Sequence, residues 1–123
     1  MDSILDSIKK LLGMDSSYNH FDTDLVLHIN SVLSILYQIG VGSKSFFITG
    51  SNEKWNDFIP DFEDIEMIKS YTALKVRMLF DPPTGGVATA IENSIKEFET
   101  RISYAVEGRK ENHGNTVSNP SWN

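Results

Sequence analysis

The sequence predicts an all-α fold. We expect a small helical bundle with three long or medium amphipathic helices, a short N-terminal helix, an irregular aromatic-rich segment and a flexible C-terminal tail. Apolar residues recur every three or four positions in four separate segments, which is the spacing of one helix face. Glycine or proline follows each of the first three segments, as expected where helices end. With 123 residues, of which 40% are hydrophobic, the chain supports one domain with a substantial core.

The first predicted helix covers residues 3–12, and Gly13 follows it as a stop. An isolated helix of this length is marginal in water, so we expect it to dock on the rest of the chain. Its two lysines, Lys9 and Lys10, are too few for the basic face of a membrane anchor. Its apolar residues, at helical spacing, are Ile4, Leu5, Ile8, Leu11 and Leu12.

The second predicted helix covers residues 22–39. Asp22 and Asp24 lie in its first turn, where they can cap the helix and where the helix dipole favours negative charge. Gly40 and Gly42 end it. Its apolar stripe, which indicates a buried face, consists of Leu25, Val26, Ile29, Val32, Leu33, Leu36 and Ile39.

Residues 43–60 form the irregular segment. The run from Phe46 to Ile48 is compatible with one short extended piece, and Trp55 to Ile59 predicts a single turn of helix before Pro60. So many large apolar groups predict a segment that packs onto the bundle.

The third predicted helix covers residues 62–80 and has two adjacent apolar lines. Together they are wider than one partner helix would cover, so this helix is either central in its own bundle or shared with a neighbouring subunit. The lines consist of Ile65, Ile68, Thr72, Val76 and Leu79, and of Met67, Tyr71, Leu74 and Met78.

A sharp corner follows at Asp81-Pro82-Pro83-Thr84-Gly85-Gly86. The prolines cannot continue the helix, and the glycines permit a tight reversal. The next helix, over residues 87–107, is therefore expected to run antiparallel to the previous one. Residues 108–123, GRKENHGNTVSNPSWN, contain almost no apolar residue before Trp122. We expect a helical domain over residues 1–107 and a flexible arm over residues 108–123.

No catalytic, cofactor-binding or metal-binding signature is present in this sequence. It has no cysteine, and its glycines do not complete a phosphate loop or a dinucleotide fingerprint. One candidate metal cluster consists of His20, Asp22, Asp24 and His28. Helix-capping acids beside two ordinary histidines explain the same pattern, so we predict no metal, no cofactor and no enzyme activity.

Charge argues against a DNA-reading protein. The formal net charge is −6, and tight binding to DNA requires a concentrated basic surface. Glu92, Glu97 and Glu99 in the last helix make a poor recognition helix. No apolar run is long enough for a membrane span, and the first residues do not form a signal peptide.

Several segments together resemble the head–tail connector (head-completion, or adaptor) proteins of tailed bacteriophages and of prophages in Gram-positive bacteria. They are an amphipathic N-terminal helix, FDTDLVLHINSVLSILYQIGVG, the WNDFI segment, and IEMIKSYTALKVRMLFDPPTGGVATAIENSIKEFETRI. The resemblance implies a virion protein, made in the host bacterial cytoplasm, that forms a homo-oligomeric ring, commonly dodecameric, beneath the portal protein. There it extends the channel for double-stranded DNA and presents a platform to the next tail-completion or stopper protein.

A ring subunit acts through its interfaces. The interface candidates are Trp55, Arg77, Asp81, Pro82, Pro83 and Trp122. A second interpretation remains open from the residues alone: a small helical regulatory or partner-binding module, either DNA-associated or antitoxin-like.

Overall fold

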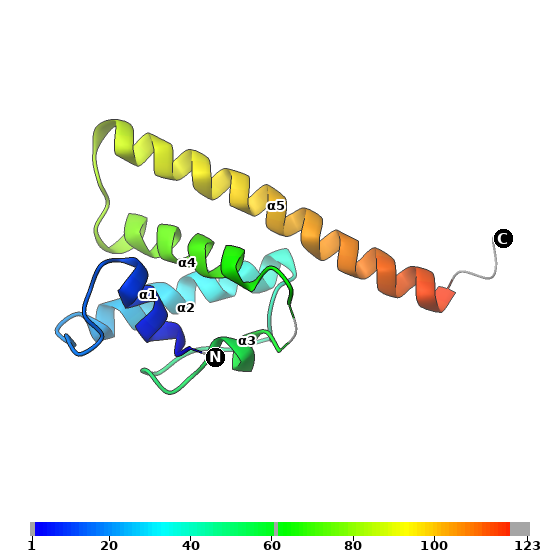
Figure 1. The fold of residues 1–123 in the computed structure, drawn as a ribbon, viewed down its shortest axis with the longest axis horizontal. Helices are drawn as coiled ribbons and strands as arrows, with labels where there is room; N and C mark the ends of the chain where they lie inside the picture. Colours follow the sequence, from blue (N-terminus) through cyan, green and yellow to red (C-terminus); the bar gives the residue numbers. More distant parts are fainter. Residues whose placement is uncertain (1, 61, 119–123) are drawn as a thin grey trace.

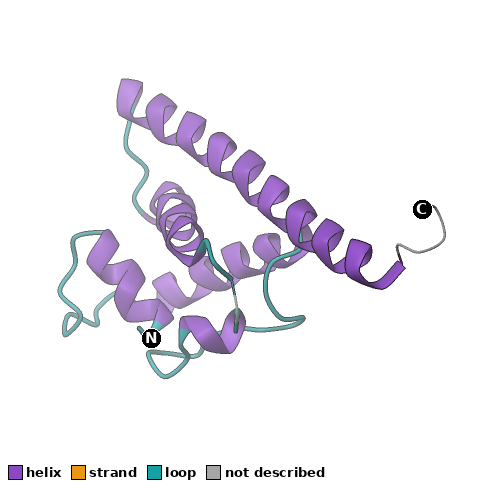
Figure 2. Ribbon diagram, turned by 45° about the vertical axis from the view of Figure 1, so that its right-hand side comes forward, coloured by secondary structure: helices purple, strands orange, loops and turns teal. Residues whose placement is uncertain are grey.

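The structure is a computed structural model that describes residues 2–60 and 62–118. Helices form the architecture of these ranges, with no strand among them (Figures 1 and 2). The predicted all-α class is therefore confirmed. The helices are α1 (Ile4–Leu11), α2 (Asp22–Ile39), α3 (Trp55–Phe58), α4 (Ile65–Phe80) and α5 (Gly85–Ser118).

The first two helices lie close to their predicted bounds. Ser3 caps α1, where its Oγ accepts a hydrogen bond of 3.2 Å from the amide of Asp6. Phe21, and not one of the predicted acids, flanks the start of α2, without a side-chain cap. Gly40 ends α2 in the left-handed conformation, at φ 113°, which glycine adopts without a steric penalty.

The short N-terminal helix docks through a buried lysine. Lys9 has only 1% of its side chain exposed, and its Nζ donates to Oδ1 of Asp22 at 2.8 Å and to the carbonyl of Ser16 at 3.0 Å. This pairing fixes α1 to the start of α2, as expected for a helix too short to persist alone.

The irregular segment packs onto the bundle as predicted, but residues 46–48 do not form a strand. The side chain of Asn30 in α2 satisfies the backbone there instead: Oδ1 accepts from the amide of Ile48 at 2.7 Å, and Nδ2 donates to its carbonyl at 3.0 Å. A side-chain partner replaces the neighbouring strand that an extended piece would otherwise need. The predicted helical turn is present as α3.

Helix α4 begins at Ile65, three residues later than predicted, and packs against α1, α2 and α5. It is therefore central in its own bundle, which is one of the two alternatives that its apolar width allowed. Its apolar surface is not fully covered, because Leu79 remains 50% exposed. The residues of α4 that are buried are Ile68, Tyr71, Thr72, Ala73 and Val76.

Helix α5 runs antiparallel to α4, as predicted, but it continues to Ser118 and not to about Glu107 (Figure 1). The expected boundary between domain and arm therefore lies inside a helix. The last part of α5 extends beyond the other helices (Figures 1 and 2). Independent movement of an arm over residues 108–123 stays a prediction. In the described part of the chain, no helix has the length and apolar character needed to cross a membrane.

Candidate functional site

The corner between α4 and α5 brings together four of the predicted interface residues. Asp81 ends α4, and its amide donates to the carbonyl of Arg77 at 2.8 Å. Arg77, Asp81 and Pro82 are exposed and Pro83 is half-buried. Gly85 reverses the chain at φ 65°, a value that favours glycine. The corner therefore lies at the surface, and its prolines restrict the backbone there.

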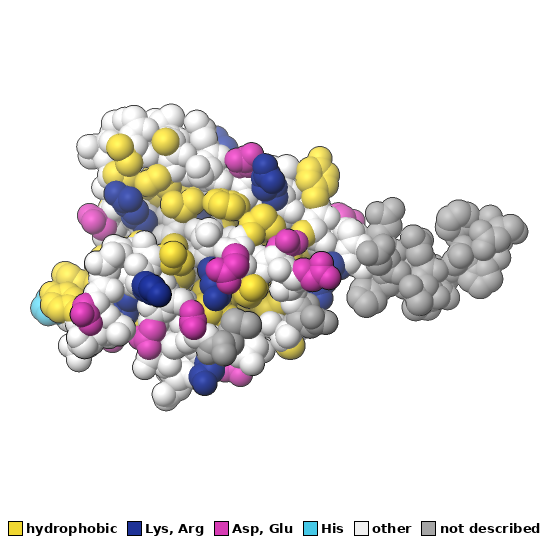
Figure 3. Space-filling model, in the orientation of Figure 1, with side chains coloured by type: hydrophobic (Ala, Val, Ile, Leu, Met, Phe, Trp, Pro, Cys, Tyr) yellow, Lys and Arg dark blue, Asp and Glu magenta, His cyan; other side chains and the backbone are white. Residues whose placement is uncertain are grey.

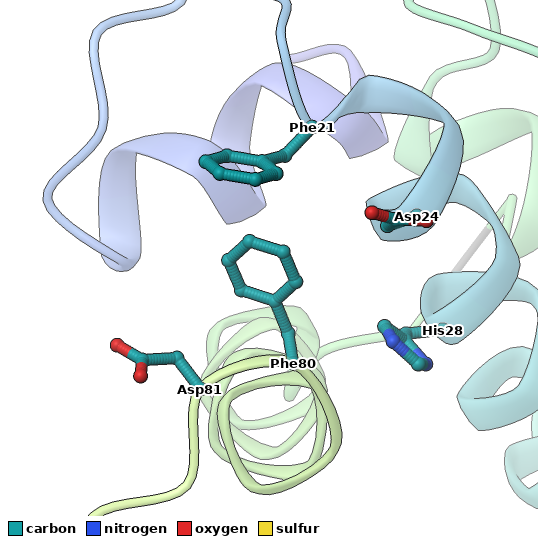
Figure 4. Close-up of a pocket in the computed structure, with 5 residues that line it drawn as sticks. All are labelled: Phe21, Asp24, His28, Phe80 and Asp81. Carbon is teal, nitrogen blue, oxygen red and sulfur yellow. The ribbon is translucent and has the colours of Figure 1, made fainter.

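Two hollows flank the end of α4, and Phe80 and Asp81 line both of them. The first, which we call the α2 hollow, has a volume of about 500 Å³. Figure 4 shows its lining residues, which are Phe21, Asp24, His28, Phe80 and Asp81. The second, which we call the α1 hollow, has a volume of about 280 Å³ and is lined by Leu11, Leu12, Met14, Arg77, Phe80 and Asp81.

Aromatic rings build the wall of the α2 hollow. Phe21 and Phe80 meet edge to face, with ring centroids 5.1 Å apart, and His28 lies 6.4 Å from Phe80 on another side. His20 also meets Phe21 edge to face, with ring centroids 4.7 Å apart. Such ring pairs stabilise the positions of aromatic side chains more than burial of their surface alone does. The wall of the hollow is therefore preformed.

The α2 hollow is also acidic. Asp24 and Asp81 are both exposed, and Figure 4 shows their carboxylates on either side of the Phe80 ring. Among the described residues, neither carboxylate forms an ion pair. A surface with aromatic walls and two unneutralised carboxylates favours a cationic partner group.

The candidate metal cluster does not assemble. Asp24 and His28 line the α2 hollow, whereas Asp22 is engaged by Lys9 at 2.8 Å. Within the part of the chain that the structure describes, no group of three or more His, Cys, Asp or Glu residues is placed to hold a metal ion.

Trp55, predicted as an aromatic anchor at an interface, is instead a core residue. Its side chain is 0% exposed, and its Nε1 donates to Oγ of Ser7 at 2.7 Å. In this fold it cannot contact another subunit. Trp122, the other predicted anchor, lies outside the described residues.

Sequence reasoning did not single out Phe21 and Phe80. Their isolated positions in the chain give no sign that they meet across the bundle. Asp24 and His28 carried a usable signal, because a spacing of four residues places them on one face of a helix.

Exposed apolar side chains extend beyond the corner. Figure 3 shows hydrophobic side chains in a band across the α4–α5 hairpin on the face in view. Scattered surface apolar residues are normal, but a continuous band is typical of an interaction surface. Among the residues whose burial the structure describes, the exposed large hydrophobic ones are Leu11, Tyr18, Leu27, Tyr37, Phe47, Leu79, Val87 and Tyr104.

Comparison with known proteins decides the family. The sequence model of the family described as phage connector protein matches residues 4–109. The chain belongs to the phage connector protein family. No curated protein and no solved structure matches it.

Family membership places the connector at a phage head–tail junction, as a structural component of the virion associated with portal and tail proteins. The matched range covers α1 to α4 and residues 85–109 of α5. The corner and both hollows therefore lie inside the family region.

Proposed function

We propose that this connector forms a homo-oligomeric ring, commonly dodecameric, beneath the portal. The ring extends the channel for double-stranded DNA and carries the next tail-completion or stopper protein. The observation that supports this most strongly is the family match over residues 4–109, together with a subunit that leaves apolar surface uncovered.

The exposed apolar residues suit a ring because they occur on more than one helix of the subunit. Leu27 lies on α2 and is 64% exposed, whereas Tyr104 lies on α5 and is 74% exposed. Contacts between two different surfaces of identical copies generate closed rings when the rotation closes. Each copy would then cover part of its neighbour.

The charge of the chain suits passage of DNA without binding. A net charge of −6 favours a channel wall that repels phosphate groups, and a basic stripe would retain them. The function is mechanical and needs no catalytic group.

The polar C-terminal residues 108–123 supply a docking arm in this proposal. Helix α5 carries the start of this segment away from the bundle, and Trp122 near the chain end is of the residue type that anchors interfaces. Docking on the portal would fix the position of the arm at an entropic cost.

A deletion tests the proposed function in the phage itself. Without the connector gene, infected cells are expected to accumulate heads and free tails that do not join, and expression of the connector in trans restores joined particles. Normal joined virions from the deletion phage contradict the proposal. Altered transcription with normal assembly would favour the regulatory interpretation.

A further inference from the structure

We propose that the α2 hollow receives the side chain of Arg101 from the neighbouring copy in the ring. This inference deepens the proposed function and rests on ring formation. It names the residue pair that sets the contact between copies.

The hollow has the chemistry of a guanidinium site. The ring of Phe80 offers a flat aromatic face, and the carboxylates of Asp24 and Asp81 lie on either side of it (Figure 4). Guanidinium groups stack on aromatic rings and donate hydrogen bonds to carboxylates. A volume of about 500 Å³ admits an arginine side chain together with part of the helix that presents it.

The chain itself limits which arginine can occupy the hollow. The sequence contains three arginines: Arg77, Arg101 and Arg109. Arg77 lines the α1 hollow beside Asp81, so it belongs to the receiving surface. The guanidinium of Arg109 lies 4.8 Å above the ring of Phe62 within its own subunit. Arg101 is left as the donor.

Arg101 is well placed to reach outward. Its side chain is 64% exposed, and its guanidinium pairs with the carboxylate of Glu97 on the preceding turn at 3.1 Å, where Glu97 is 66% exposed. An exposed ion pair of this kind contributes little stability. Arg101 can therefore leave Glu97 and bind in the hollow of a neighbouring copy. Tyr104, three residues further on the same helix face, is 74% exposed and adds an aromatic contact.

The two surfaces are different and lie apart on the subunit, as a head-to-tail contact requires. The hollow lies at the α4–α5 corner, whereas Arg101 lies at the middle of α5, which runs away from that corner (Figure 1). The buried face of α5 includes Ile95, Ile102 and Val106. Arg101 and Tyr104 leave the helix on its outer side.

Charge reversal tests the pair. Sedimentation velocity and native mass spectrometry would measure ring formation of the full chain at about 0.1 M salt, where screening between nearby charges is incomplete. Asp81→Lys or Arg101→Glu alone is expected to weaken association about tenfold or more, because like charges then meet. The combined variant is expected to recover most of the loss.

Matched controls carry the same charge changes elsewhere. Glu63→Lys lies before the opposite end of α4, and Lys96→Glu lies on another side of α5; both should form rings as the unaltered chain does. Circular dichroism would establish that every variant folds.

The inference is wrong if Asp81→Lys and Arg101→Glu form rings as well as the controls do. That result leaves the proposed function intact. If the combined variant does not recover ring formation, Arg101 is not the residue that binds in the α2 hollow. Absence of rings from the unaltered chain, alone and with its portal, overturns the proposed function.

Discussion

The phenol of Tyr71 donates a hydrogen bond of 2.8 Å to Oε2 of Glu99 and so connects α4 to α5. Tyr71 is fully buried, and Nζ of Lys75 lies 3.9 Å from the same carboxylate oxygen. The contact fixes the two helices on either side of the corner, so it positions both the exposed apolar band and the hollows.

Removing this hydroxyl should loosen the hairpin. We expect Tyr71→Phe to lower the free energy of unfolding by about 1–2 kcal/mol, because a buried hydrogen bond to a charged group is lost while Glu99 can regain water. Urea denaturation followed by circular dichroism would measure it. A variant with unchanged stability would show that the bond contributes nothing to the fold.

The same residue predicts an alkaline pH dependence. Burial raises the pKa of Tyr71 well above its ordinary value, and the hydrogen bond and the negative charge of Glu99 raise it further. A group whose pKa is raised on folding contributes stability below its unfolded pKa of about 10, and this contribution decreases as the pH rises above that value. Tyr71→Phe should therefore flatten the fall in stability above pH 10. If the free energy of unfolding falls equally steeply above pH 10 in Tyr71→Phe and in the unaltered protein, this prediction is wrong.

The buried pair Lys9–Asp22 predicts an asymmetry between its two partners. Asp22→Asn leaves the buried ammonium of Lys9 without a counter-charge and should lower the free energy of unfolding by about 2–3 kcal/mol, a value reduced because Asp22 is 34% exposed. Lys9→Met fills the same volume with apolar atoms and should change stability by less than about 1 kcal/mol. Chemical denaturation of both variants would test this order, and a larger loss for Lys9→Met would contradict it.

Gly42 is required at its position for two reasons. Its φ is 90°, and a Cβ there would lie 2.2 Å from the ring of Phe58. Gly42→Ala should therefore lower the free energy of unfolding by about 3 kcal/mol. Gly86→Ala is the matched control, since a Cβ there meets open space, and it should change stability by less than about 1 kcal/mol. Equal thermal midpoints for the two variants would exclude the clash.

These features mark where sequence reasoning succeeded and where it could not. The bounds of α2 were predicted correctly because its apolar spacing and Gly40 signal the helix and its end. The packing of the segment that holds Trp55 was predicted from its aromatic residues, but its hydrogen-bond partner Ser7 was not, because Ser7 lies 48 residues away in the chain. The α2 hollow was missed for the same reason, since Phe21 and Phe80 meet only in the folded bundle.

The end of α5 shows a different limit. The loss of apolar residues after Val106 predicts that the helix ends near residue 107. A helix that already has a packed nucleus can add residues at one hydrogen bond each, without further burial. The absence of a core face therefore does not fix where a helix ends, and α5 continues to Ser118.

If residues 108–123 act as a docking arm, their removal should weaken binding to the portal without destabilising the fold. Deletion of residues 111–123 keeps Arg109, which lies over the ring of Phe62, so the unfolding midpoint should change little. Binding to the portal protein of the same phage, measured by surface plasmon resonance, should weaken at least tenfold. Unchanged portal binding would show that these residues are not a docking arm.

The most direct test of the central claim is a cryo-electron microscopy structure of the connector assembled on its portal. We predict a closed ring in which neighbouring copies cover Leu79, Val87 and Tyr104, now 50%, 55% and 74% exposed. Connector copies that sit on the portal without touching one another, with these side chains still open to solvent, would contradict it.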